Sequence, residues 1–62
     1  MSGLRVNQEV YNALWQNRVY VYELADYLGI HENTLLRRLR KELPQEEKEY
    51  YISLILKNSK KE

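Results

Sequence analysis

Apolar residues recur at helical spacing in four segments of the chain, and no segment sustains the alternation of a β-strand. The first segment predicts a helix that begins at Asn7, a good N-cap residue, carries Glu9 in its first turn and ends near residues 17–18. Asn17 is suited to that end because asparagine tolerates the left-handed conformation that terminates helices. The residues expected to face the core are Val6, Val10, Ala13 and Leu14, and a second pair, Tyr11 and Trp15, widens the apolar face.

Two shorter helices are predicted in the middle of the chain. The first covers about residues 21–28, and Gly29 interrupts its pattern. The second runs from Glu32 to about Glu42. Tyr20 stands where a capping serine or threonine is expected. The inward-facing residues are Val21, Leu24, Ala25 and Leu28 in the first helix, and Leu35 and Leu39 in the second.

A fourth helix is predicted from Pro44 to about Lys57 or Asn58. Pro44 ends the preceding helix, since the residue before a proline is pushed out of helical geometry, and it suits the first position of the next helix. This helix is apolar on nearly all sides, so one side is expected to pack on the first and third helices and the other on a second subunit. The residues predicted for such a homodimer interface are Tyr50, Tyr51, Leu54 and Ile55.

The length of 62 residues allows one domain, with an ordered core expected over about residues 6–58. The chain has no cysteine and its only histidine is His31, so no metal site and no cofactor are predicted. No acid–base pair lines a predicted cleft, which argues against an enzyme and a small-molecule substrate. No long apolar run is present, and we therefore expect no membrane span, no signal peptide and a cytoplasmic location.

The net charge of +1 is unevenly distributed. Residues 31–41 hold four basic residues and one acid, a balance of +3, and residues 42–49 hold four acids and one lysine, a balance of −3. A compact basic segment of this kind is typical of a single charged face.

The spacing of four residues in the central segment predicts a helix-turn-helix. Ala25 is small enough for two helices to cross closely, and Gly29 accepts the positive φ of a tight turn. Ile30 is placed to anchor the turn, and Leu35 to lock the second helix against the first. The predicted fold class is therefore all-α, a single four-helix domain with a central helix-turn-helix.

Four sequence runs carry a resemblance to a known superfamily: ELADYLGI at residues 23–30, TL at 34–35, RRLR at 37–40 and ELPQEEK at 42–48. They resemble the repressor- and Cro-like helix-turn-helix proteins, and more closely the short regulators of phages and mobile elements of Gram-positive bacteria. The resemblance spans about residues 10–56. The chain departs from it at Arg38, where many members carry an apolar core residue, and at Arg18, a turn position where many carry glycine.

The resemblance implies that residues 32–41 form a recognition helix for double-stranded DNA. By position, the residues expected at base edges are Glu32, Asn33, Leu36 and Arg37. Those expected nearer the DNA backbone are His31, Thr34, Arg38, Arg40 and Lys41. The chemistry agrees, since an arginine can bind guanine O6 and N7 together and an asparagine can pair with adenine.

The leading hypothesis is a sequence-specific DNA-binding protein, most simply a transcriptional repressor that inserts helix 32–41 into the major groove and binds as a homodimer. Two alternatives stay open. One is an architectural recombination directionality factor. The other is a helix-turn-helix that binds protein, such as an anti-repressor or an inhibitor of a host enzyme, and it is motivated by six tyrosines and one tryptophan beside a near-zero net charge.

Overall fold

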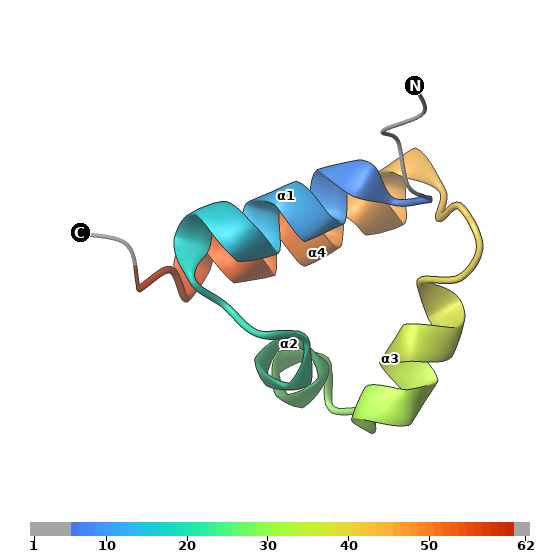
Figure 1. The fold of residues 1–62 in the computed structure, drawn as a ribbon, viewed down its shortest axis with the longest axis horizontal. Coiled ribbons are helices and arrows are strands. Elements are labelled where there is room, and N and C mark those ends of the chain that lie inside the picture. The colour runs from blue at the N-terminus through green and yellow to red at the C-terminus, as the bar shows by residue number, and fades with distance from the viewer. Residues whose placement is uncertain (1–5, 61–62) are drawn as a thin grey trace.

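The computed structural model describes residues 6–60, which form four helices and no strand: α1 (Gln8–Asn17), α2 (Val21–Leu28), α3 (Glu32–Arg38) and α4 (Gln45–Lys57). The predicted all-α class and the single small domain are confirmed. Helices α1 and α4 lie side by side and run in the same direction, while α2 and α3 form an angled pair beside them (Figure 1).

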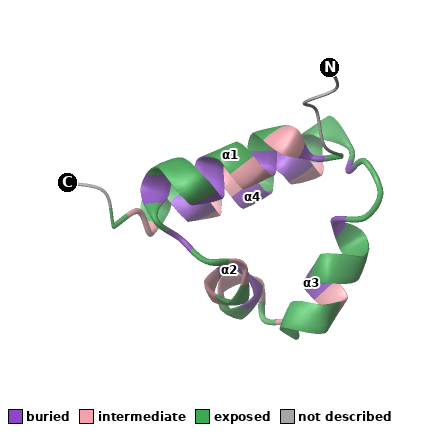
Figure 2. Cartoon of the chain, viewed as in Figure 1, coloured by how far each residue is buried: buried purple, intermediate pink, exposed green. Residues whose placement is uncertain are grey.

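The core lies where α1, α2 and α4 meet and extends to the inner side of α3 (Figure 2). The buried apolar residues supply most of the stabilisation available to so small a domain, since burial of each valine, leucine or isoleucine side chain contributes about 1.5–3 kcal/mol. The buried apolar residues are Val10, Ala13, Leu14, Val19, Leu24, Ala25, Leu35, Leu39, Leu43, Tyr51 and Ile55. Val21 and Leu28 are half-buried against this core. Val6 was predicted to belong to it and does not, because it precedes α1 and is 43% exposed.

Helices α1 and α2 end in the same backbone motif. Arg18 has φ 58° and Gly29 has φ 74°, both left-handed. In each case two N–H groups fold back onto the helix: Arg18 and Val19 donate to the carbonyls of Trp15 and Leu14, at 3.3 and 3.0 Å. This Schellman arrangement satisfies carbonyls that a helix end leaves free. The left-handed residue of α1 is therefore Arg18, and the prediction that Asn17 would take that role is wrong, because Asn17 stays helical.

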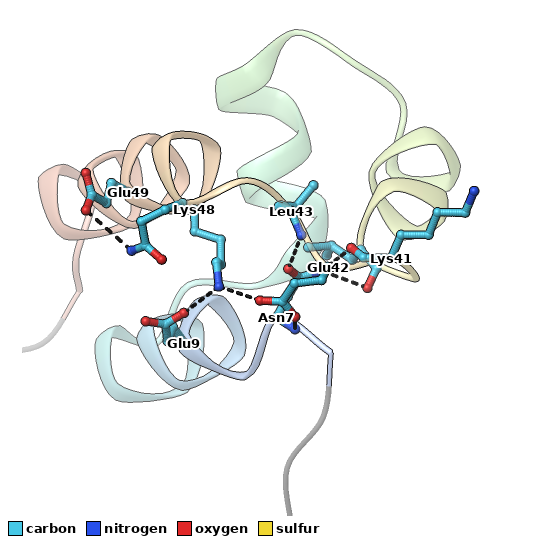
Figure 3. Close-up of polar contacts among 9 residues, drawn as sticks. Asn7, Glu9, Lys41, Glu42, Leu43, Lys48 and Glu49 are labelled. Carbon is cyan, nitrogen blue, oxygen red and sulfur yellow. Dashed lines mark hydrogen bonds and ion pairs between the residues drawn. The ribbon is translucent and has the colours of Figure 1, made fainter.

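Helix α3 is shorter than predicted, since it ends at Arg38 and not near Glu42. The reason lies in Asn7, which is 1% exposed. Its side-chain amide donates to the carbonyls of Leu39 at 3.0 Å and Lys41 at 2.8 Å, and its oxygen accepts the Leu43 N–H at 2.8 Å (Figure 3). These bonds take backbone groups that would otherwise continue the helix.

Two helix starts also differ in detail from the prediction. Asn7 precedes α1, but its side chain makes no capping bond and its φ is 59°. Pro44 precedes α4 as the capping residue and is not the first helical residue. Helix α2 begins as predicted at Val21, and the Glu23 carboxylate accepts the backbone N–H of the preceding residue Tyr20 at 3.0 Å, as the glutamate of a capping box does.

Candidate nucleic-acid interface

Helices α2 and α3 form the predicted helix-turn-helix. Gly29 ends α2, Ile30 packs half-buried against the core, and α3 begins at Glu32 after a turn of three residues, 29–31. Ala25 and Leu35 are 2% and 0% exposed, so the small residue and the anchoring leucine lie at the predicted contact. In Figure 1, α2 is seen nearly end-on while α3 lies across the view, which is the steep crossing that this motif requires.

The outer side of α3 is open to solvent. Leu35 points inward, and the predicted DNA-contacting residues lie on the exposed surface with the exception of the half-buried Thr34. The exposed ones are His31, Glu32, Asn33, Leu36, Arg37, Arg38, Arg40 and Lys41. Leu36 is 39% exposed, so a leucine lies among polar side chains on this surface without contributing fully to the core.

The basic residues of this surface fall into two groups. Within residues 6–60, the side chains of Arg37, Arg40 and Lys41 form no ion pair. Arg38 donates to the Tyr51 hydroxyl at 3.4 Å, and this bond raises the pKa of Arg38. Arg38 therefore joins α3 to α4.

Arg40 and Lys41 do not lie on α3, because this helix ends before them. They occupy the turn that follows, where the N–H groups of Arg40 and Lys41 bond three residues back at 3.2 and 3.4 Å. The prediction of a helix over residues 32–41 is thus wrong in its last turn. Both side chains remain exposed next to the C-terminal end of α3.

Three of the seven acidic residues that the structure describes outside α3 form ion pairs within the domain. Lys48 is buried to 8% exposure and contacts Glu9 Oε1 at 2.9 Å and Glu42 Oε2 (Figure 3). The bond to Lys48 lowers the pKa of Glu42, and the two carboxylates, Glu42 first, raise the pKa of Lys48. Lys60 pairs likewise with Glu23, whose pKa it lowers. By contrast, Arg37, Arg40 and Lys41 are exposed and form no such pair within residues 6–60.

The predicted homodimer interface on α4 is wrong for two of its four residues. Tyr51 and Ile55 are 1% and 0% exposed within the monomer, because α4 turns this side toward α1 and α2. Leu54 is half-buried against the same core, and only Tyr50, at 55%, is well exposed.

One exposed surface was missed by the sequence reasoning. Trp15 is 84% exposed beside a groove of about 540 Å³. The residues that line the groove are Tyr11, Leu14, Trp15, Arg18, Val19, Tyr20 and Val21. The sequence pattern could have predicted this exposure. Val10, Ala13 and Leu14 already fill the buried face of the helix, so Trp15 lies on another face.

Among residues 6–60 no group of three or more histidine, cysteine or carboxylate side chains could hold a metal ion, and none of the four helices has the length and apolarity of a membrane span. Comparison of the chain with protein-family models finds no matching family, and comparison with curated proteins and with solved structures likewise finds no match.

Proposed function

We propose that the protein binds double-stranded DNA in a sequence-specific manner through α3 and acts as a transcriptional regulator, most simply a repressor. The observation that carries the proposal is the outer side of α3, where Asn33, Leu36 and Arg37 are exposed next to cations that no carboxylate of the described chain neutralises.

The dimensions of α3 suit the major groove. An α-helix with its side chains is about 10–12 Å in diameter, and the groove is about 12 Å wide. Arg37 can bind guanine O6 and N7, Asn33 can pair with adenine, and Leu36 can contact a thymine methyl group. Arg40 and Lys41, in the turn after α3, are placed to contact phosphates and to fix the register of the helix.

The experiment that tests the proposal is selection of bound duplexes from a random DNA pool, followed by affinity measurement of the variant Arg37→Ala. We expect the variant to lose about 1–3 kcal/mol on the selected site and to lose preference at one base position. Lys57→Ala is the matched control. It removes one positive charge from an exposed residue at the C-terminal end of α4, away from α3 (Figure 1).

Two results would contradict the proposal. Selection that enriches no sequence would exclude specific binding, and equal loss of affinity by Arg37→Ala on every duplex would exclude a base-reading role for this residue. The phosphate contacts are tested separately by measuring affinity at several salt concentrations. Arg40→Ala and Lys41→Ala should each reduce the slope of log affinity against log salt by about 1.

A protein-binding function is the second candidate, and the exposed Trp15, Tyr20 and Tyr22 favour it, with exposed fractions of 84%, 62% and 54%. Reversal of charge at Arg37 and Arg40 to glutamate separates the two functions. Loss of biological activity together with DNA binding supports the DNA proposal, whereas full activity after the reversal supports a protein partner.

A further inference from the structure

The turn that follows α3, residues 39–43, is held to the start of α1 by Asn7. The side-chain amide of Asn7 donates to the carbonyls of Leu39 and Lys41. Its oxygen accepts the N–H of Leu43. Asn7 is 1% exposed, so these three bonds are shielded from water, and they fix the path of the turn at both ends and in the middle.

Glu42 gives this turn a second attachment. One oxygen of its carboxylate accepts the backbone N–H of Asn7 at 3.1 Å, and the other contacts the ammonium of Lys48 on α4 (Figure 3). The single acid of the turn is thus bound on the side that faces α1 and α4. The side chain of Lys41 extends away from Asn7 in Figure 3.

Two cations lie between these attached groups. Arg40 and Lys41 are exposed and form no ion pair within residues 6–60. Helix α3 has seven residues, ends before both cations and packs mainly on α2, so its packing does not set where the two cations lie. Asn7 and Glu42 set the path of the backbone that carries them.

We infer that Asn7 is a positioning residue for DNA binding: it fixes the turn so that Arg40 and Lys41 meet phosphates while α3 contacts the bases. This role rests on the proposed function and adds that the base-contacting and phosphate-contacting groups have separate supports. A cation on a fixed backbone loses less conformational freedom on binding than one on a free turn. Asn7 itself is buried and uncharged, so it acts on the DNA affinity of the folded protein through the turn.

The test measures the affinity of Asn7→Gly for the selected duplex at several salt concentrations. Glycine accepts the φ of 59° and the net charge is unchanged, but the three side-chain bonds to the turn are lost. We expect binding to weaken about tenfold and the slope of log affinity against log salt to fall by about 1–2, as if phosphate contacts had been removed. The preference for each base should stay as in the wild type, because α3 keeps its own packing.

Double-mutant cycles separate the two groups of contacts. In the Asn7→Gly background, Arg40→Ala should weaken binding by a factor at least about threefold smaller than in the wild-type background, because the released turn no longer holds this cation in place. Arg37→Ala should weaken binding by the same factor in both backgrounds, since Arg37 lies on α3. A loss of folded protein would instead reduce all of these affinities alike.

Ile55→Val is the matched control for lost stability. It removes one methyl group from a core position near the end of α4, away from the turn, and should leave the salt slope unchanged. Circular dichroism sets a temperature at which every variant is folded. Amide hydrogen exchange without DNA then checks the turn. The N–H of Leu43 should exchange faster in Asn7→Gly, whereas the N–H of Leu39, bonded to the carbonyl of Leu35 at 2.9 Å, should stay protected.

Two results would overturn the positioning role. In one, the Leu43 amide exchanges no faster in Asn7→Gly, so that Asn7 does not hold the turn. In the other, the Leu43 amide is released while the salt slope and the effect of Arg40→Ala stay as in the wild type. Failure of the proposed function looks different: Arg37→Ala, Arg40→Ala and Lys41→Ala then bind every duplex as the wild type does, and the positioning role falls with it.

Discussion

The two ends of the α1–α4 pair are each closed by a polar cluster, and the clusters differ in burial. At the N-terminal end, Asn7 is 1% exposed and bonds three backbone groups of residues 39–43, with the buried Lys48 beside it. At the C-terminal end, Lys60 pairs with Glu23 and lies 5.4 Å from the centre of the Tyr20 ring, with its side chain 45% exposed.

The two clusters have nearly the same sequence separation between their partners but differ in burial, so we expect burial to determine how much each polar contact stabilises the fold. Asn7 and Leu43 are 36 positions apart, and Lys60 and Glu23 are 37 positions apart. A buried backbone group that loses its partner costs its full desolvation, about 1–3 kcal/mol, whereas water replaces the partner of an exposed ion pair. We therefore expect the N-terminal cluster to hold the fold and the C-terminal cluster to contribute little.

The largest effect is expected for Asn7→Ala. This variant removes three hydrogen bonds and leaves the Leu43 N–H and the carbonyls of Leu39 and Lys41 without their partner. We expect a loss of about 3 kcal/mol, or on the order of 15 °C in Tm, measured by thermal unfolding.

Asn7→Gly is the control for that experiment. It removes the same side-chain bonds but accepts the φ of 59° without strain, so its stability should lie between those of Asn7→Ala and the wild type. A Tm of Asn7→Ala equal to that of the wild type would show that the buried amide does not hold the N-terminal end.

An intermediate effect is expected for Lys48→Met, together with a change in acid sensitivity. Lys48 lowers the pKa of Glu42, so the stabilisation from this pair is complete above the ordinary pKa of a glutamate and is lost as the pH falls through the lowered one. Methionine keeps an apolar stem and removes the charge. The fall in Tm between about pH 7 and about pH 3 should therefore be smaller in the variant than in the wild type.

Parallel pH profiles of Lys48→Met and the wild type would contradict this account of Glu42. The second carboxylate, Glu9, lies 2.9 Å from the same ammonium, so Glu9→Gln in the wild-type background tests whether one carboxylate is sufficient. We expect Glu9→Gln to change the acid sensitivity less, because Glu42 is the stronger influence on the pKa of Lys48.

The smallest effect is expected for Lys60→Ala. The pair with Glu23 is exposed, and the Glu23 carboxylate keeps its bond to the Tyr20 N–H in the variant. We expect a slight decrease in Tm at low ionic strength and none that can be measured at high salt, where exposed pairs are screened. A decrease as large as that of Asn7→Ala would overturn the comparison of the two ends.

The sequence predicts those parts of the fold that depend on residues close together along the chain. The turn between α2 and α3 depends on Ala25, Gly29 and Leu35, which lie within ten positions of one another, and both short helices begin where the spacing places them. The end of α3 depends instead on Asn7, more than thirty positions away. A lone asparagine before a helix is typical of an N-cap, and no local sequence pattern indicates that Asn7 instead bonds the distant backbone of residues 39–43.

The surfaces are predicted less well than the core for a related reason. The second half of α4, residues 50–56, is apolar on most sides, so its composition does not tell which side faces α1, and Tyr51 and Ile55 were assigned to the wrong side. The basic residues near α3 were placed on its outer side because Leu35 and Leu39 were expected to face inward, and both are buried. A helix with a single apolar stripe reveals its outer face, and one without a stripe does not.

The bonds of Asn7 also bear on how the molecule folds. They enclose α1, α2 and α3 in one loop whose ends lie 36 positions apart, and they form only when those ends meet. Closing a loop of this length costs chain entropy that the growth of a single helix does not cost, so we expect the bonds of Asn7 to form after the helices and late in folding. A late closure of this kind makes position 7 act on the lifetime of the native state, since bonds absent from the transition state slow unfolding and leave refolding unchanged.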